Sequence, residues 1–331
     1  MNPTAQSMTN EAARRSISIP AIDVRDLRGN DAGARQACGR AIDRACRDIG
    51  FFYVVGHDLD QDLVRETFAV SCEFFGRPMP EKMQIEMARS PLYRGYFPVG
   101  GEVTDPKAGG DAKEGFDMAL ELPADDPDVR AGKPLHGANQ WPAAPARFRS
   151  VLLRYYERLT ELGSLLSTGF ALALDLPADF FAAKVSRPTA ILRVLHYPPQ
   201  RPRTNIDAFG CGAHSDYGYL TILAQDDVGG LQLQDRAGEW VDVVPVAGSF
   251  ICNIGELMSR WTNDRYAATK HRVISASGRD RYSIPFFFHP NYDVEISCLP
   301  SCQGTGNPAR YAPVTSGDYV RERLAGAYAK P

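Results

Sequence analysis

The sequence predicts a mainly β domain with flanking helices, and three observations carry this prediction. Short apolar and β-branched runs alternate with turns from Ala190 to His289, as in a series of antiparallel strands. Residues Ala146 to Leu174 show the three-and-four spacing of apolar side chains that marks a helix buried along one face. From about Ile17 to Gly56, a strand, a helix and a second strand follow one another. The order indicates a β core supported by helices.

The first half of the chain supplies most of the predicted support. Apolar residues recur at helical spacing between Asp31, a suitable N-cap, and Gly50, which is expected to end that helix. A further helix is predicted from Asp62 to Phe75, closed by Pro78 and Pro80.

Glycine, proline and charged residues dominate the segment from Ser90 to Pro145, a composition that favours loops or a lid over a site. A chain of 331 residues with 44% hydrophobic content can bury a large core, and we expect a single domain. We divide the chain into a polar, flexible N-terminus (1–16) and one domain (17–331). The domain begins with N-terminal α/β and helical support that includes a lid (17–175). The β core (176–300) and a C-terminal segment (301–331) follow.

Charge and hydropathy exclude several classes of protein. The net charge is −3 with intermixed signs, and this argues against nucleic acid as a partner. No apolar stretch is long enough for a membrane span, and Met1 to Arg15 lacks the apolar centre of a signal peptide. We therefore expect a cytoplasmic protein that acts on a small-molecule substrate, with no obligate protein partner evident.

The seven cysteines, an odd number without paired spacing, indicate reduced thiols. Cys38 and Cys46 fall on the apolar stripe of the first helix and are expected to be core side chains. Cys211 precedes a candidate metal ligand by three residues, and we expect it to pack in the core as well.

The triplet His214-Ser215-Asp216, together with His271 far downstream, indicates a metal site. In an extended segment residues i and i+2 point to the same side, so His214 and Asp216 can grip one metal while Ser215 faces away. Two imidazoles and one carboxylate occupy one face of an octahedral ferrous ion and leave the opposite positions open for a chelating acid and O₂. His271 can supply the third ligand from a neighbouring strand.

A His-x-Asp triplet also arises by chance, usually in a surface turn. Its context favours the metal site: a glycine-rich entry, Gly210-Cys211-Gly212, leads through the triplet into the apolar run Leu220 to Leu223. His271 lies in a second strand-like run, Thr269 to Ile274.

These segments resemble the isopenicillin N synthase-like branch of the 2-oxoglutarate, Fe(II)-dependent oxygenases. The resemblance extends to Gly50-Phe51-Phe52-Tyr53-Val54-Val55-Gly56-His57, Trp240 to Pro245 and Asn253-Ile254-Gly255-Glu256. It implies a double-stranded β-helix, a variety of jelly roll, and an enzyme that binds Fe(II) through His214, Asp216 and His271 and consumes 2-oxoglutarate and O₂ with release of succinate and CO₂. Leu192 to Gln200, Ala224 to Gly230 and Gly100 to Thr104 are similar to segments of microbial ethylene/succinate-forming enzymes, whose long insertion and C-terminal tail this chain does not share.

A dicarboxylic keto acid needs a cation for the carboxylate that does not chelate the metal, and a guanidinium can hold it with two hydrogen bonds. Arg281 and Ser283 share one face of the strand-like run Arg281 to Phe288, so both can bond that carboxylate. The resemblance implies the same role and adds Tyr197 as a contact of 2-oxoglutarate. The alternative is a surface arginine paired with Asp280.

We also predict that Arg193, Glu102 and Tyr217 contact the primary substrate. Strand alternation puts Arg193 on one face with Ile191, Leu195 and Tyr197, and a cation on an apolar strand needs a partner. That partner is either a substrate carboxylate or a protein carboxylate such as Glu102 or Glu121.

Three functions of different class fit these residues. The first is a 2-oxoglutarate-dependent oxygenase. The second is an Fe(II) oxidase of the isopenicillin N synthase type, in which Arg281 and Ser283 would bind the substrate instead of the keto acid. The third is a non-catalytic jelly roll that binds a metal or a small molecule. The remaining histidines, His57, His136, His196 and His289, have no ligand-type neighbours in the sequence and are expected to be structural.

Overall fold

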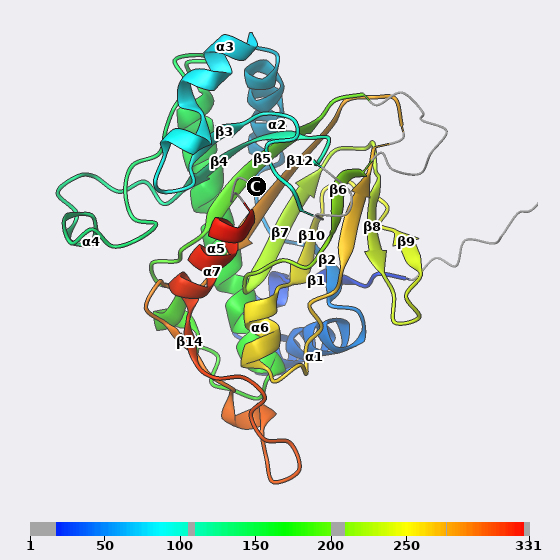
Figure 1. The fold of residues 1–331 in the computed structure, drawn as a ribbon. Helices are drawn as coiled ribbons and strands as arrows, with labels where there is room; N and C mark the ends of the chain where they lie inside the picture. Colours follow the sequence, from blue (N-terminus) through cyan, green and yellow to red (C-terminus); the bar gives the residue numbers. More distant parts are fainter. Residues whose placement is uncertain (1–17, 105–109, 200–208, 276, 328–331) are drawn as a thin grey trace, which may run out of the picture.

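Two sheets face each other in the computed structural model, which describes residues 18–104, 110–199, 209–275 and 277–327 (Figure 1). The large sheet contains β1 (Ala21–Asp23), β2 (Phe51–Val55), β3 (Gly95–Phe97), β4 (Glu114–Ala119), β5 (Ile191–Tyr197), β7 (Leu220–Gln225), β10 (Phe250–Ile254) and β12 (Arg281–Phe288). The small sheet contains β6 (Phe209–His214), β8 (Leu231–Gln234), β9 (Trp240–Asp242) and β11 (His271–Ile274). Two short strands, β13 (Glu295–Ile296) and β14 (Val314–Thr315), pair separately. The predicted flexible N-terminus, residues 1–16, lies outside the described residues.

Strands distant in sequence lie next to each other in both sheets. The large sheet runs in the order β1-β2-β10-β7-β12-β5-β4-β3, and the small sheet in the order β6-β11-β8-β9. All of these neighbours are antiparallel except β1 and β2. Two facing, mostly antiparallel sheets with crossed connections form a jelly roll, which confirms the predicted fold class.

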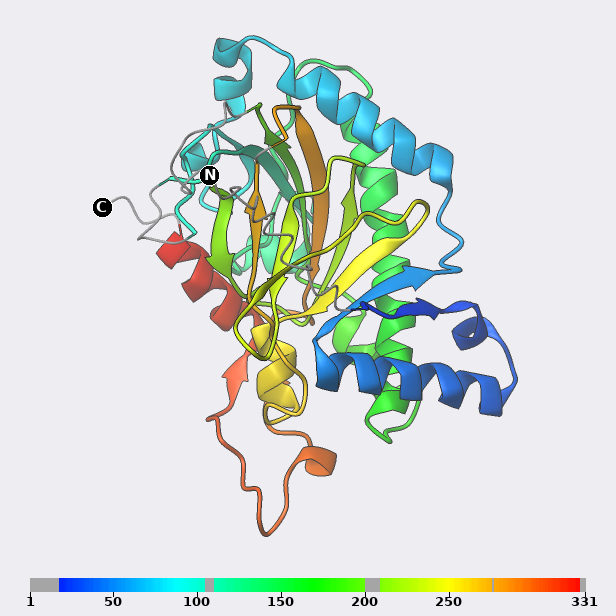
Figure 2. The same ribbon diagram turned by 90° about the vertical axis from the view of Figure 1, so that its right-hand side faces the viewer.

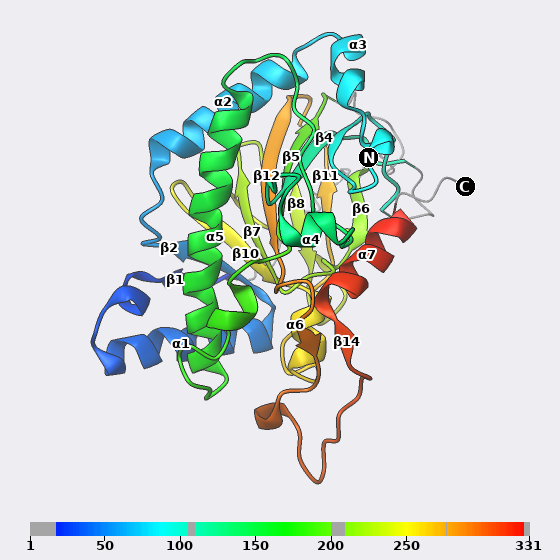
Figure 3. The same ribbon diagram turned by 90° about the vertical axis from the view of Figure 1, so that its left-hand side faces the viewer.

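Three helices cover the outer face of the large sheet, as Figure 3 shows: α1 (Ala32–Asp48), α2 (Gln61–Phe75) and α5 (Phe148–Ala173). The other helices are α3 (Met79–Lys82), α4 (Pro127–Arg130), α6 (Glu256–Trp261) and α7 (Ser316–Ala327), with short 3-10 turns at Arg25–Arg28, Met83–Ile85, Met87–Arg89, Ala182–Val185 and Pro300–Cys302. Helix α7 lies on the opposite side of the large sheet from α5 (Figure 2). Among the described residues no helix is both long and apolar enough to cross a membrane.

The two faces of the large sheet bury two different cores. Strand β5 illustrates the division, because Leu192 and Val194 pack with the helices whereas Leu195 and Tyr197 point between the sheets. The inter-sheet core also contains Val273 of β11. This alternation follows from the pleat of a strand, and it leaves the inter-sheet side of β5 free to carry site residues.

Several predicted elements are confirmed. Asp31 caps α1 by accepting hydrogen bonds from the backbone N–H groups of Gly33 and Ala34, and Gly50 follows the helix with a φ of 70°, a conformation that favours glycine. Cys38 and Cys46 are buried in the helix-side core.

Two predictions about the first half are wrong. The helix predicted from Asp62 to Phe75 is confirmed as α2 (Gln61–Phe75), but Pro78 and Pro80 do not close it: Pro78 is the N-cap of α3 and Pro80 lies in its first turn, where a proline loses no hydrogen bond. The segment Ser90 to Pro145 is not only loop, since it contains β3 and β4, two buried strands of the large sheet. The glycines and charged residues of this segment gave it the composition of a loop, so the two strands were not predicted.

Candidate active site

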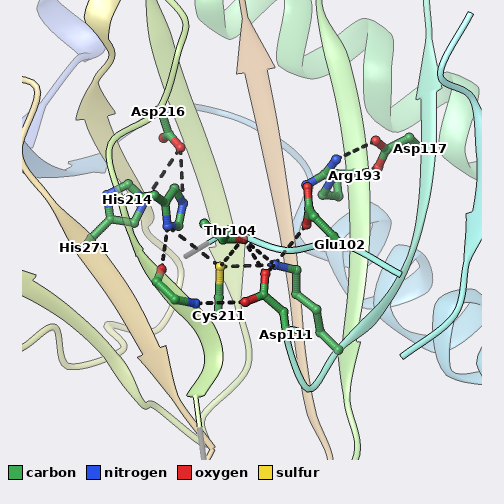
Figure 4. Close-up of polar contacts among 11 residues, drawn as sticks. Glu102, Thr104, Asp111, Asp117, Arg193, Cys211, His214, Asp216 and His271 are labelled. Atoms are coloured by element: carbon green, nitrogen blue, oxygen red, sulfur yellow. Dashed lines mark hydrogen bonds and ion pairs between the residues drawn. The ribbon is translucent and has the colours of Figure 1, made fainter. Parts of the chain in front are cut away.

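Three side chains with metal-ligand chemistry converge where the small sheet ends. His214 is the last residue of β6, His271 is the first residue of β11, and the two are register partners across the ladder. Asp216 follows β6 by two residues. Its Oδ1 lies 3.7 Å from His214 Nε2 and 3.6 Å from His271 Nε2, and one ligand atom from each residue falls within 4.8 Å of the others (Figure 4).

The second oxygen of Asp216 is already occupied. Oδ2 accepts hydrogen bonds from Thr221 Oγ1 at 2.5 Å and from Asn253 Nδ2 at 2.6 Å. Such contacts orient a ligating carboxylate, and here they leave Oδ1 turned toward the two imidazoles.

Both imidazoles are oriented by backbone carbonyls. His214 Nδ1 lies 2.8 Å from the carbonyl of Gly212, and His271 Nδ1 lies 3.1 Å from that of Thr269. A carbonyl only accepts hydrogen bonds, so each Nδ1 carries the proton and donates it. In the neutral form of each ring the lone pair is therefore on Nε2, the nitrogen that faces Asp216.

Burial and charge set the protonation states of the three side chains. Burial, together with the positive charge that His214 carries when it is protonated, lowers the pKa of His271 to about 4. For His214 burial would lower the pKa, but Cys211 and Asp216 outweigh it and raise the pKa to about 9, so a metal ion must displace a proton from this ring. For Asp216 burial would raise the pKa, but the two histidines and the hydrogen bonds from Thr221 and Asn253 outweigh it, and the pKa is lowered. A neutral imidazole and an ionised carboxylate are the ligand forms of these side chains.

The donor set fits a ferrous ion. The three ligand atoms lie within 4.8 Å of one another at a pocket that these residues line, so His214, Asp216 and His271 could hold one ion there. Two histidines and one carboxylate on one side of an ion are the pattern of non-haem Fe(II) oxygenases with open positions for other ligands.

Arg281 lies across the pocket on β12 and is 2% exposed. Its Nε donates to the carbonyl of Gly229 at 2.6 Å and its Nη2 contacts Gln225 Oε1 at 3.4 Å. Its Nη1 is buried and has no hydrogen-bond partner among the described residues. A buried guanidinium with an unused donor is suited to an anionic ligand.

Tyr197 and Ser283 accompany Arg281. Tyr197 of β5 is its register partner, and the guanidinium carbon lies 4.7 Å from the centre of the tyrosine ring. Ser283 lies two residues along β12 and lines the same pocket. Asp280, the alternative partner of Arg281, instead contacts His196 Nε2 at 2.7 Å.

Arg193 is held by two carboxylates. Asp117 of β4 accepts from Nε and Nη2, both at 2.8 Å, and Glu102 accepts from Nη1 at 2.9 Å. The structure thus contains the ion pair with Glu102 that the sequence left open. Glu121 lies elsewhere and contacts Asn139 and other residues.

The charge network continues from Glu102 to the side of the metal triad. Lys113 Nζ lies 3.0 Å from Glu102 Oε2, 2.6 Å from Asp111 Oδ2 and 3.1 Å from Cys211 Sγ. Cys211 Sγ in turn lies 3.7 Å from His214 Nδ1. Cys211 is buried, as expected, but it also makes polar contacts that the sequence did not indicate. Figure 4 shows Asp111, Thr104 and Cys211 between the metal triad and Arg193.

Several residues in and beside this pocket were not predicted from the sequence. Lys113 lines the pocket, Asp111 contacts it, and Asp117 reaches Arg193 through the pairing of β4 with β5; all three lie in a segment that was interpreted as loops. Nor were Leu324 and Ala327 of α7, which line the pocket together with Tyr217. No local pattern marks the last two, because their position depends on how α7 packs.

His196 has carboxylate neighbours that its sequence context did not reveal. Its Nδ1 lies 2.8 Å from Glu114 and its Nε2 2.7 Å from Asp280, both brought from other segments. The prediction concerned neighbours along the sequence, and the two carboxylates come from segments more than 80 residues away. Within the described residues, His214, Asp216 and His271 are nevertheless the one group with metal-ligand geometry.

Two family models match the chain. Residues 19–144 match the N-terminal region of non-haem dioxygenases in morphine synthesis, and residues 188–290 match the 2OG-Fe(II) oxygenase superfamily. The second match contains the three candidate ligands and Arg281.

Two curated relatives extend over nearly the whole chain. A 2-oxoglutarate-Fe(II) type oxidoreductase of Emericella nidulans is 37% identical over 94% of this chain and 90% of its own. A homoarginine-6-hydroxylase of Oryza sativa is 36% identical over 93% of this chain and 96% of its own.

Solved structures agree with the fold. A full-length Neurospora crassa protein in complex with alpha-KG superposes with a TM-score of 0.85 at 28% identity, covering 95% of this chain and 98% of that chain. The complex of the same protein with alpha-KG and thymine has a TM-score of 0.84 at 29% identity, with the same coverage. The matches confirm that the enzyme uses Fe(II), 2-oxoglutarate and O₂, as the first of the three functions requires, and the chain belongs to the 2OG-Fe(II) oxygenase superfamily.

Proposed function

We propose that His214, Asp216 and His271 bind the Fe(II) of this oxygenase. The observation that carries the assignment is the orientation of the three ligand atoms: Nε2, Oδ1 and Nε2 face one point, while the other atom of each side chain is hydrogen-bonded. Bound Fe(II) supplies O₂ activation coupled to oxidative decarboxylation of 2-oxoglutarate.

The distal carboxylate of 2-oxoglutarate is assigned to Arg281, Ser283 and Tyr197. Arg281 offers the unpartnered Nη1, and the Tyr197 ring supports the plane of the guanidinium. Burial makes a charge-assisted hydrogen bond at this position strong, because little water competes for it. In this assignment Arg281 orients the keto acid so that its other end reaches the metal.

For the primary substrate we propose a small molecule that carries a cationic group, with Glu102 as its anchor; a bound cation would share the two oxygens of Glu102 with Arg193 and Lys113. Five charged side chains form a connected network beside this half of the pocket, and each is at most 8% exposed; Glu102, Lys113 and Arg193 line the pocket itself. Three are carboxylates, Glu102, Asp111 and Asp117, and two are cations, Lys113 and Arg193, so their formal charges sum to −1. A buried excess charge is costly unless a ligand of opposite sign neutralises it.

Arg193 is a poor receptor for a substrate carboxylate. Two protein carboxylates already take three of its nitrogens, so an added anion would have to displace one of them. The homoarginine-6-hydroxylases among the relatives act, by name, on a molecule with a guanidino group. This supports a cationic substrate and the overall reaction R–H + 2-oxoglutarate + O₂ → R–OH + succinate + CO₂.

Matched pairs of substrates test the charge requirement. L-Homoarginine and L-arginine carry a guanidinium, whereas L-homocitrulline and L-citrulline have a neutral ureido group of the same shape. We expect the cationic member of each pair to stimulate succinate release and to gain one oxygen atom by mass spectrometry. Equal turnover of the neutral members, or of thymine, would contradict the assignment.

Two variants locate the charge. Glu102→Gln should reduce the preference for the cationic member, whereas Glu322→Gln, the same change at an exposed position of α7, should not.

Ethylene formation from 2-oxoglutarate with L-arginine stays a prediction from the sequence resemblance. Gas chromatography of the gas phase above the same reactions measures it.

A further inference from the structure

Helix α7 forms one wall of the substrate side of the pocket. It is separated from α1, α2 and α5 by the large sheet (Figures 2 and 3). Leu324 is 6% exposed and lines the pocket with Ala327, and across from them Ile191 and Phe287 of the large sheet line it as well. The last turns of the helix therefore border the space in which a substrate must lie.

Glu256, the first residue of α6, joins this helix to the segment that carries two of the candidate metal ligands. Its Oε2 accepts hydrogen bonds from Tyr319 Oη at 2.5 Å and from Arg323 Nη2 at 2.8 Å, both on α7. Its Oε1 accepts from Ser215 Oγ at 2.8 Å, and Ser215 lies between His214 and Asp216. We call these four residues, Ser215, Glu256, Tyr319 and Arg323, the Glu256 clasp.

The backbone fixes the position of Glu256. Its N–H donates to the carbonyl of Asp216 at 2.8 Å. The preceding residue must be glycine, because a Cβ at Gly255 would lie 2.3 Å from the carbonyl oxygen of Gly218. The start of α6 is thus packed directly on the turn that follows the metal-ligand segment, and the carboxylate has little freedom to move.

The clasp also touches a pocket residue. The guanidinium carbon of Arg323 lies 5.7 Å from the centre of the Tyr217 ring, which lines the pocket, and Arg323 Nη2 donates to Tyr319 Oη at 2.8 Å. A single exposed ion pair contributes little to stability. A carboxylate shared by three donors from two segments instead fixes the orientation of those segments.

We propose that Glu256 is a positioning residue that holds α7 against the metal-ligand segment, and that Leu324 is a specificity-determining residue on the wall so formed. The inference rests on the proposed metal site, because the clasp acts on the segment between His214 and Asp216. Substrates enter the space bounded by Leu324 only when α7 is in place, and 2-oxoglutarate, held by Arg281 on β12, depends on it much less.

Hydrogen exchange of the purified full-length protein tests the positioning role without any substrate. Glu256→Gln and Tyr319→Phe should each speed amide exchange in residues 316–327 by at least roughly tenfold, with exchange in β10 unchanged. Glu322→Gln, on the same helix but outside the clasp, should leave exchange as it is. Unchanged exchange of α7 in both clasp variants would overturn the proposal, whether or not a cationic substrate has been found.

Steady-state kinetics with L-homoarginine as the probe test the consequence. Both clasp variants should raise the KM for L-homoarginine about tenfold or more while the KM for 2-oxoglutarate stays within about twofold. An equal rise in both constants would indicate general damage and contradict a positioning role. If L-homoarginine is not turned over by the unmodified enzyme, the proposed substrate class fails, and the exchange experiment still decides the role of Glu256.

Leu324 is tested by changing the size of its side chain. Leu324→Trp should abolish product formation from L-homoarginine while succinate release from 2-oxoglutarate alone continues. Leu324→Ala should raise the KM for L-homoarginine and reduce the amount of product formed per succinate. A Leu324→Trp enzyme that turns over L-homoarginine like the unmodified enzyme would show that this wall does not limit the substrate.

Discussion

His271 lies directly opposite His214 across the antiparallel ladder of β6 and β11, so the pairing of these two strands brings together two candidate ligands that are far apart in sequence. Their ring centres are 4.3 Å apart. Because a ladder position is set by many neighbouring contacts, the spacing does not depend on the metal itself.

The first prediction concerns the three ligands. His214→Ala, Asp216→Ala and His271→Ala should each abolish Fe(II) binding and turnover while the protein stays folded, because two remaining ligands hold a labile ion poorly. Isothermal titration with Fe(II) under anaerobic conditions and far-ultraviolet circular dichroism measure the two properties. Full iron occupancy in any one variant would show that the ligand is wrongly assigned.

The second prediction concerns Asn253, which donates to Asp216 Oδ2. Asn253→Ala should weaken Fe(II) binding about 10- to 100-fold, the usual effect of removing a residue that orients a metal ligand. Asn307→Ala provides the control, since Asn307 donates to the carbonyl of Cys302 and does not line the pocket. Equal affinities for Fe(II) in the two variants would mean that Asn253 does not orient Asp216.

The third prediction concerns 2-oxoglutarate. Arg281→Ala should weaken its binding by about 2 to 4 kcal/mol, which corresponds to a roughly 30- to 1000-fold rise in Kd. Arg281→Lys should recover little, because an ammonium group lacks the fork of the guanidinium. Unchanged affinity in Arg281→Ala would exclude this arginine as the carboxylate receptor.

The fourth prediction concerns the buried pair of Arg193 and Asp117. Arg193→Ala leaves Asp117, which is 1% exposed, without its bidentate partner. The free energy of unfolding should fall by about 3 to 5 kcal/mol. Arg193→Lys, which keeps the charge, should lose less. Chemical denaturation measures both, and an Arg193→Ala protein of normal stability but impaired turnover would favour direct contact with the substrate.

The fifth prediction concerns the pH dependence of the stability that ionised Glu102 contributes. Burial would raise the pKa of Glu102, but Arg193 and Lys113 outweigh it and hold the pKa well below the ordinary value of 4.5. A carboxyl group with a lowered folded-state pKa stabilises the protein above its unfolded-state pKa, and that stabilisation is lost as the pH falls below it. The difference in unfolding free energy between the unmodified protein and Glu102→Gln should therefore shrink between about pH 7 and about pH 3. A difference independent of pH would contradict the ionised state.

Much of the site follows from strand alternation and could be predicted. Arg193 and Tyr197 of β5, and Arg281 and Ser283 of β12, all face the pocket as the period of two requires. The candidate metal ligands were predicted for the same reason, since His214 and Asp216 are two residues apart.

Of the partners of Arg193, the sequence analysis named Glu102 as one alternative, and the structure contains that pair, but Asp117 could not be predicted. Asp117 meets Arg193 because β4 pairs with β5, and the composition around β4 resembles a loop. Leu324 reaches the pocket because the Glu256 clasp holds α7 in place. The clasp joins segments that are distant in sequence, so no local periodicity could predict it.

An anaerobic titration of the Fe(II)-loaded protein with 2-oxoglutarate, followed by the visible charge-transfer band of a 2-oxo acid chelated to Fe(II), tests the proposed iron centre most directly. The band should saturate in the unmodified protein, require a much higher 2-oxoglutarate concentration in Arg281→Ala, and be absent in Asp216→Ala. A band of full intensity in Asp216→Ala, or no band in the unmodified protein, would contradict the proposed centre.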